Sequence, residues 1–366
     1  MKDSRFGLHF QRIPSWASER VLPMDLEWIK IVDPPIANPF PGKKIIGRIY
    51  HEEGKDNDLI MVGAAGGAEY FAQCASTYYS STYVSVWEGP NEPPVRTAVQ
   101  REMLSKFTLR WIELMHKYGF RTAALSLSVG WPDIGTAQSF AKVVEETDYL
   151  SLHEYSAPQM QSSEGYHCLR YRNTVKELAE VGIMPPKIFI TEAGIDGGVI
   201  PGGARKGWRT YANGRQDYFD QLLWYDSELK KDPYVIAFTP FTSGPYPDWT
   251  DFNFDEDLVE MLATYLETVI DLPENPAESP VPVPVPIPVI PVEEIIRKAC
   301  WDRQNISYNP AAALQKAAAE EFLMAPIGPE FDIDGYRVQA YADGIVYCKI
   351  GHWDDVRLVF WDKARR

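Results

Sequence analysis

Residues Thr82–Pro93 have the sequence TYVSVWEGPNEP, a run of β-branched and aromatic residues that ends at a glutamate and a proline. Such a run predicts a buried strand. The proline predicts where strand pairing stops, because proline has no N–H to donate to a ladder. Seven other segments have the same character. The eight predicted strands are Phe6–Phe10, Trp28–Val32, Lys44–Tyr50, Tyr83–Trp87, Thr122–Ser128, Tyr149–Tyr155, Ile188–Thr191 and Val235–Phe241.

Amphipathic segments separate most of these strands. Val95–Tyr118 places apolar side chains at helical spacing and is followed by Gly119, a suitable C-cap. Gln216–Lys231 and Asp257–Val269 have the same pattern, whereas the first two connections are irregular and rich in proline. Eight strands with crossover connections predict an α/β fold, a (β/α)₈ TIM barrel. A doubly wound open sheet is the alternative, disfavoured because no GxGxxG turn follows the first strand.

A proline-rich stretch divides the chain. Residues Pro273–Val292 have the sequence PENPAESPVPVPVPIPVIPV, which predicts an extended polyproline-II spacer; a ligand for a proline-recognising domain is the alternative. The predicted organisation is a barrel over 1–272, a linker over 273–292 and a small α+β domain over 293–366. In that domain the predicted helices are Glu293–Arg303 and Pro310–Leu323, and the predicted strands are Tyr336–Tyr341, Ile345–Ile350 and Val356–Trp361.

Composition argues against several classes of partner. The net charge of −15, from 36 basic and 51 acidic residues, argues against a nucleic-acid groove and against an anionic membrane. No segment is apolar for long enough to span a bilayer. Eleven Trp and 20 Tyr suit a carbohydrate substrate, because flat rings stack on sugar faces. The four cysteines form no CxxC motif; Cys300 and Cys348 could pair, and two free thiols are the alternative.

Two glutamates carry the chemistry. Glu92 ends the fourth predicted strand, and Glu192, in KIFITEAGID, ends the seventh. In a TIM barrel the C-terminal ends of the strands meet at one face, and enzymes with this fold have their catalytic residues there. A pair of carboxylates across a scissile bond is what glycoside hydrolysis needs. The plainer interpretation is that both are ordinary carboxylates at strand ends in solvent.

The segments WEGPNEP and ITEAG resemble the acid/base and nucleophile motifs of the clan A glycoside hydrolases. These are retaining (β/α)₈ enzymes with catalytic glutamates on strands four and seven, and the resemblance covers about residues 1–272. It implies that Glu92 is the acid/base, that Glu192 is the nucleophile and that Asn91 binds the sugar 2-hydroxyl. It implies no metal or organic cofactor.

The sixth predicted strand, LSLHEYS, places His153 and Tyr155 on one face, two residues apart. In the family such a pair points into the site and the tyrosine binds the nucleophile, so both are candidate substrate-site residues; the alternative is that they fill the barrel mouth. Arg48 on the third strand is a further candidate. Many clan members carry an arginine on the second strand, where this chain has Lys30. His9 is expected to be a satisfied core residue.

Tryptophans in the loops after the strands are candidate stacking platforms for sugar rings. Trp131, Trp208 and Trp249 follow the fifth, seventh and eighth predicted strands. The clan usually has a tryptophan at the end of strand eight; here that strand ends in PFTSG and Trp249 comes later. Trp131 and Trp249 are therefore predicted to bind substrate.

The C-terminal region, LMAPIGPEFDIDGYRVQAYADGIVY, resembles LGFP-type repeats of cell-wall-associated bacterial proteins without their leading LGFP string. This resemblance implies a glycan- or wall-binding module; a structural appendage of the barrel is the alternative. The predicted function is retaining hydrolysis of a β-linked poly- or oligosaccharide. The alternatives are a peptidoglycan-directed lytic enzyme and a non-catalytic carbohydrate-binding barrel. The N-terminus, MKDSRFGLHF, shows no signal peptide, and we expect action outside the cell or at its wall.

Overall fold

The structure is a computed structural model that describes residues 3–52, 54–184, 187–269, 313–320, 326–341 and 344–360. The chain divides into two compact units, Met1–Val285 and Pro286–Arg366. The predicted linker and the predicted helix Glu293–Arg303 lie outside the described residues. The predicted domain boundaries therefore stay predictions.

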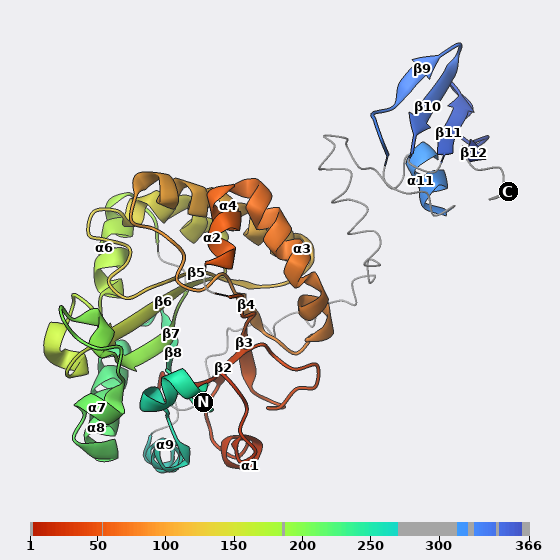
Figure 1. Ribbon diagram of the computed structural model, residues 1–366. Coiled ribbons are helices and arrows are strands. Elements are labelled where there is room, and N and C mark those ends of the chain that lie inside the picture. Colours follow the sequence, from red (N-terminus) through yellow and green to blue (C-terminus); the bar gives the residue numbers. More distant parts are fainter. Residues whose placement is uncertain are drawn as a thin grey trace. The chain divides into compact units, whose positions relative to one another are not determined.

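The first unit is a barrel of eight parallel strands (Figure 1), in which each strand pairs with the next along the chain. The strands are β1 (Leu8–Phe10), β2 (Trp28–Val32), β3 (Lys44–Arg48), β4 (Val86–Glu88), β5 (Thr122–Leu127), β6 (Tyr149–Ser156), β7 (Lys187–Ile195) and β8 (Val235–Pro240). Backbone hydrogen bonds join the segments of the first and last strands, among them those from Gly7 N–H to the Phe238 carbonyl at 2.8 Å and from Ser243 N–H to the His9 carbonyl at 2.7 Å. The predicted TIM barrel is confirmed, and the open-sheet alternative is wrong.

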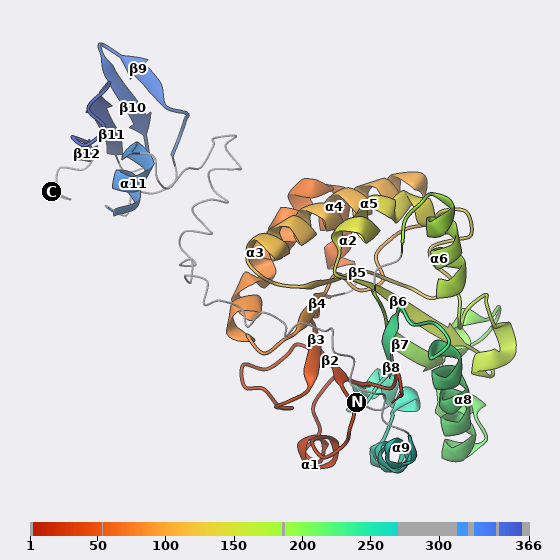
Figure 2. The same ribbon diagram turned by 180° about the vertical axis from the view of Figure 1, so that it is seen from behind.

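Helices occupy the connections and surround the strands, as the two opposite views show (Figures 1 and 2). The α-helices are α1 (Ala17–Val21), α2 (Lys55–Met61), α3 (Ala64–Ser80), α4 (Ala98–Lys117), α5 (Ala141–Glu146), α6 (Tyr171–Glu180), α7 (Trp208–Tyr211), α8 (Gly214–Leu229) and α9 (Glu256–Thr268). The short 3₁₀ helices are η1 (Ala137–Phe140), η2 (Met160–Ser163), η3 (Gly197–Val199) and η4 (Pro247–Phe252).

Helix α4 begins and ends where its sequence predicts. Thr97 and Gln100 form a reciprocal capping box at its start, which satisfies N–H groups that have no partner within the helix. Gly119 follows with φ 79°, a conformation that glycine adopts without strain. The first two connections are irregular, as expected: α1 is short, and the described residues 33–43 between β2 and β3 contain no helix.

An apolar layer fills the barrel near the start of the strands. It consists of buried side chains from β2 to β8, namely Trp28, Ile46, Val86, Ala123, Tyr149, Phe189 and Ala237. This layer fills the interior of the barrel at the N-terminal ends of the strands. Polar side chains that point inward from the same strands therefore lie toward the C-terminal end. No helix among the described residues has the length and hydrophobicity needed to cross a membrane.

The second unit contains helix α11 (Ala313–Glu320) and an antiparallel sheet in the order β12-β11-β10-β9. The strands are β9 (Phe331–Ile333), β10 (Tyr336–Ala340), β11 (Gly344–Lys349) and β12 (Arg357–Phe360). Leu314 and Ala318 of α11 pack on Tyr341, Val346 and Cys348. Three of these strands were predicted, and β9 was missed. Cys348 is a buried free thiol, and Cys300 lies outside the described residues.

Candidate active site

The strand period of two places a polar layer directly above the apolar layer. Side chains two residues apart on a strand share a face. Trp28, Ile46 and Val86 are thus followed by Lys30, Arg48 and Glu88, all of which are buried. Likewise Tyr149 and Phe189 are followed by Ser151 and Thr191. The same pattern that builds the core therefore delivers charged groups from β2, β3 and β4 to one level of the barrel.

A bulge in β7 brings Glu192 into this layer beside Thr191. The register between β6 and β7 shifts after Leu152, which pairs with Ile190, so that His153 pairs with Glu192. A bulge adds one residue to a strand and re-aims the side chains next to it. Both neighbours consequently point inward: the Thr191 hydroxyl donates to Glu88, and Glu192 contacts Lys30.

Glu192 is surrounded by donors. Its Oε1 accepts from Arg48 Nη1 at 2.9 Å and from Lys30 Nζ at 3.1 Å, and its Oε2 accepts from the Tyr155 hydroxyl at 2.8 Å. Burial on its own would raise the pKa of Glu192, but His153, Lys30 and Arg48 together hold the pKa well below its usual range. The carboxylate is therefore ionised and oriented.

Glu92 lies on the loop after β4 and has a different environment. Its side chain is 33% exposed, against 7% for Glu192. Its backbone has φ 43°, and its N–H donates to the Ser126 carbonyl at 3.1 Å. Ser126 and its neighbour Leu125 also have positive φ, where the β5–β6 register is interrupted. Strained backbone on both sides of this hydrogen bond thus presents Glu92 to solvent at the barrel mouth.

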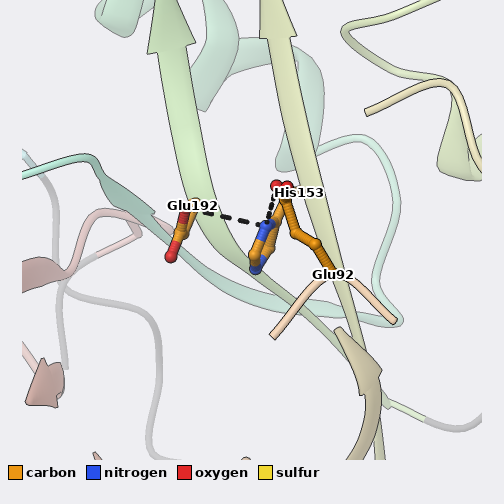
Figure 3. Close-up of side chains that lie close together, drawn as sticks. All are labelled: Glu92, His153 and Glu192. Carbon is orange, nitrogen blue, oxygen red and sulfur yellow. Dashed lines mark hydrogen bonds and ion pairs between the residues drawn. The ribbon is translucent and has the colours of Figure 1, made fainter. Parts of the chain in front are cut away.

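His153 stands between the two glutamates (Figure 3). Its Nδ1 lies 2.9 Å from Glu92 Oε1 and 3.6 Å from Glu192 Oε2. Burial would lower the pKa of His153, but the carboxylates of Glu192, Glu88 and Glu92 raise it to about 9. The imidazole is therefore a buried cation at neutral pH.

The remaining predicted residues differ in how they relate to this cluster. The side-chain oxygen of Asn91 accepts a hydrogen bond from Arg48, which leaves its amide nitrogen to donate elsewhere. Lys30 of β2 and Arg48 of β3 both contact the predicted nucleophile. His9 is buried as expected but not satisfied, since neither ring nitrogen has a hydrogen-bond partner in the part of the chain that the structure describes. Burial, Lys30 and Arg48 lower the pKa of His9, so its ring is neutral.

Two side chains of the site were missed from the sequence. Glu88 is a third carboxylate of the site and is buried like Glu192; the period of two along β4 would have placed it on the face of Val86. Phe241 follows β8, in the place where the clan usually has tryptophan, and its ring centroid lies 5.2 Å from His9 and 6.3 Å from Tyr155.

The predicted tryptophan platforms have three different positions. Trp249 is partly buried in η4 and packs on Phe241 and Phe252, in the same cluster as Tyr155. Its ring carries the Arg205 guanidinium at 5.3 Å from the centroid. Trp131 is partly exposed in the turn after β5. Trp208 of α7 is 3% exposed and stacks on Tyr218 of α8, so the expectation of an exposed platform there is wrong.

The ligand atoms of Glu92, His153 and Glu192 all lie within 4.8 Å of one another, a spacing that a metal ion could use. The surrounding charges disfavour one. Lys30 and Arg48 already neutralise Glu192, and His153 is itself a cation. An added metal ion would meet positive charge on every side of the nucleophile, so the arrangement suits proton transfer better than metal binding.

Comparisons with known proteins give distant structural likenesses. No family model matches the sequence and no curated protein matches it, so the resemblance to LGFP-type repeats gains no support. Among solved structures, an endo-β-1,3-glucanase of family GH128 from Amycolatopsis mediterranei has 13% identity over 71% of this chain and 99% of its own, with a TM-score of 0.45. A glucosidase from Croceicoccus marinus has 11% identity over 73% and 69%, with a TM-score of 0.48. A modular endo-β-1,4-mannanase from Cellulomonas fimi has 14% identity over 72% and 71%, with a TM-score of 0.44. Likenesses this distant carry no functional argument, which rests on the site itself.

Proposed function

We propose that the barrel is a retaining glycoside hydrolase that cleaves β-linked poly- or oligosaccharides by double displacement. The observation that carries the proposal is the spacing of the two glutamates. One carboxylate oxygen of Glu92 lies within 4.8 Å of one of Glu192. Retaining enzymes hold their carboxyl groups about 5–5.5 Å apart, whereas inverting enzymes need about 6.5–9.5 Å to admit a water molecule.

The environments of the two carboxylates support different roles. Glu192, ionised and fixed by Arg48, Lys30 and Tyr155, is suited to attack the anomeric carbon. Glu92 is open to solvent and is suited to protonate the leaving oxygen, and then to take a proton from the incoming water. The free amide nitrogen of Asn91 is suited to donate to the sugar 2-hydroxyl.

Azide rescue tests the two roles separately. Glu192→Ala should abolish turnover of an aryl β-glycoside, and azide should restore it with an inverted glycosyl azide. Glu92→Ala should spare substrates with good leaving groups, and azide should then give the retained product. NMR of the anomeric proton distinguishes the two products. Identical behaviour of the two variants would refute the assignment.

The substrate is to be found by screening β-1,3-glucan, β-1,4-mannan, β-1,4-glucan, xylan and peptidoglycan, with product size as the measurement. Cleavage of peptidoglycan alone would favour the lytic alternative. Binding without cleavage of any of these glycans would favour the non-catalytic barrel.

We also propose that the C-terminal unit binds a glycan or cell-wall surface. Phe331, Ile333 and Tyr336 are 49%, 54% and 42% exposed. Tyr336 pairs with Ile333, and Phe331 pairs with Val338, so all three lie on one face of the sheet. The opposite face carries Val346 and Cys348 under α11. Sedimentation of the full chain with insoluble β-glucan or cell walls, compared with a Tyr336→Ala variant, tests this proposal; equal sedimentation of the two would contradict it.

A further inference from the structure

A third carboxylate, that of Glu88, lies beneath the two proposed catalytic glutamates. Its side chain is fully buried and is bound from three other strands. Lys30 Nζ of β2 lies 2.8 Å from Oε2, while the hydroxyls of Ser151 on β6 and Thr191 on β7 donate to Oε1 at 2.8 and 2.6 Å. A buried charge is costly unless it is paired and hydrogen-bonded, and this one is both.

The position of Glu88 constrains the imidazole of His153. Nδ1 lies within hydrogen-bonding distance of Glu92 Oε1, at 2.9 Å, whereas Nε2 has no hydrogen-bond partner among the described residues and lies 3.7 Å from Glu88 Oε1, an electrostatic contact. A neutral imidazole carries only one N–H and would turn a lone pair toward one of these carboxylates. Only the imidazolium presents a proton to both sides. The carboxylates of Glu88 and Glu92 on either side of the ring therefore favour the imidazolium form, whose Nδ1–H donates to Glu92.

Lys30 links Glu88 to the proposed nucleophile. Its ammonium group lies 2.8 Å from Glu88 Oε2 and 3.1 Å from Glu192 Oε1, and its side chain is fully buried. Without Glu88 this ammonium group would have one carboxylate instead of two and would be free to shift. Glu88 thus fixes both cations that face the catalytic pair from below.

We propose that Glu88 is a positioning residue of the active site: its carboxylate keeps His153 doubly protonated toward Glu92 and holds Lys30 against Glu192. The inference rests on the proposed function for its kinetic consequences. The part of the proposal that concerns the charge of His153 can be measured without any substrate.

The test is Glu88→Gln, which keeps the shape and removes the charge. The amide oxygen can face Lys30 while its NH₂ donates to the hydroxyls of Ser151 and Thr191, so the packing can be kept. The groups that face His153 are Glu88, Glu92, Glu192 and Lys30. Loss of one nearby carboxylate should lower the titration midpoint of His153 by about one to three pH units. NMR of ¹⁵N-labelled histidine measures it, with the signal assigned by its loss in His153→Asn.

Kinetics give a second measurement that a purely structural role would not move. In Glu88→Gln turnover should fall in kcat with little change in KM, because Glu88 has no exposed surface from which to touch substrate. Unchanged titration of His153 in a folded Glu88→Gln variant would overturn the proposal.

A second variant covers the case in which Glu88→Gln does not fold. Lys30→Met removes a cation from between Glu88 and Glu192, so the midpoint of His153 should rise and the acid limb of the kcat/KM profile should move to higher pH. If neither moves, the proposed link through Lys30 is wrong.

The matched control is Glu154→Gln, because Glu154 lies on the opposite face of β6 and accepts from the backbone N–H groups of Leu169 and Tyr171 at 2.6 and 2.8 Å. This variant should lower thermal stability and leave the titration of His153 unchanged; a comparable shift of the His153 midpoint in Glu154→Gln would overturn the proposal.

If the wild type cleaves no β-glycan, the proposed function fails, while a shifted His153 midpoint in Glu88→Gln would still support the role of Glu88.

Discussion

Replacement of Arg48 by methionine tests the electrostatic basis of the proposed nucleophile. Arg48 Nη1 lies 2.9 Å from Glu192 Oε1, and both side chains are only 7% exposed. Breaking a buried ion pair costs about 3–5 kcal/mol. We expect the low end, about 3 kcal/mol, because Lys30 and Tyr155 still bind Glu192 in the variant. Since one pKa unit corresponds to 1.36 kcal/mol, the pKa of Glu192 should rise by about two units.

The assay is the pH dependence of kcat/KM on an aryl β-glycoside that the wild type cleaves. Glu192 must be ionised to attack, so the acid limb should move to higher pH by about two units in Arg48→Met. The pH-independent value of kcat/KM should also fall, because Asn91 loses its hydrogen bond from Arg48. The free energy of unfolding should change with pH in the same direction as kcat/KM. The pKa of Glu192 lies lower in the folded protein than in the unfolded chain, so its charge stabilises the fold above about pH 4. That contribution is lost as pH falls through the folded pKa, and the variant should lose it at higher pH.

Arg172→Met is the matched control for this experiment. Arg172 on α6 forms an ion pair with Asp232 at 2.7 Å, away from the catalytic pair. Its loss should lower the melting temperature without moving the acid limb. If Arg48→Met leaves the acid limb at the wild-type position, or if Arg172→Met moves it equally, the cations around Glu192 do not set its charge and the reasoning fails.

Three further outcomes are expected. Tyr155→Phe removes a hydrogen bond to a charged group, worth about 1.5–3 kcal/mol, so kcat/KM should fall about ten- to a hundredfold; a change within experimental error would contradict a role at Glu192. Burial raises the pKa of Glu154 to about 7. As pH rises from about 4 to 7, this carboxyl group ionises in the unfolded chain before it does so in the folded protein, so the free energy of unfolding should fall over that range. Thermal melts of Glu154→Gln should show a smaller fall. A chain that ends at Leu272 should cleave small substrates at near wild-type rates but insoluble polymer more slowly, and aggregation of this shorter chain would refute an independent barrel.

The architecture could be predicted from the sequence because it depends on local patterns. Strand order followed from eight alternating apolar runs, and α4 from its periodicity and its terminal glycine. Glu92 and Glu192 could be singled out because each follows such a run. Their catalytic roles remain predictions, but the structure does bring them together with His153 (Figure 3).

The bulges could not be predicted, because a bulge is defined by the register of a partner strand. The predicted seventh strand, Ile188–Thr191, stops short of Glu192, whereas β7 runs to Ile195 with Thr191 and Glu192 both facing inward. The interrupted register of β5 that holds Glu92 is likewise set by long-range pairing. Phe241 could not be found from the clan pattern, because that pattern has a tryptophan at the end of strand eight and this chain has a phenylalanine after β8.

The charge balance of the site leads to a last prediction, made with Glu192→Gln. Three carboxylates, Glu88, Glu92 and Glu192, face three cations, Lys30, Arg48 and His153. In the first step of the proposed mechanism Glu92 gives its proton to the leaving oxygen, and Glu192 becomes an ester and loses its charge, so that two carboxylates then face three cations. In the second step Glu92 acts as the base that takes a proton from the incoming water.

Glu192→Gln imitates the ester in charge and can be examined without substrate. Burial lowers the pKa of His153 and Glu192 is the first of the groups that raise it, so loss of the Glu192 charge should lower that pKa from about 9. An opposite charge within about 4–6 Å shifts a pKa by about one to three units, and Glu192 Oε2 lies 3.6 Å from His153 Nδ1. Histidine NMR should therefore show His153 titrating well below its wild-type midpoint, and Asp232→Asn, far from the barrel mouth, should leave it unchanged. If His153 keeps its wild-type midpoint in Glu192→Gln, the two groups are not coupled, and the imidazolium cannot respond to esterification of the nucleophile.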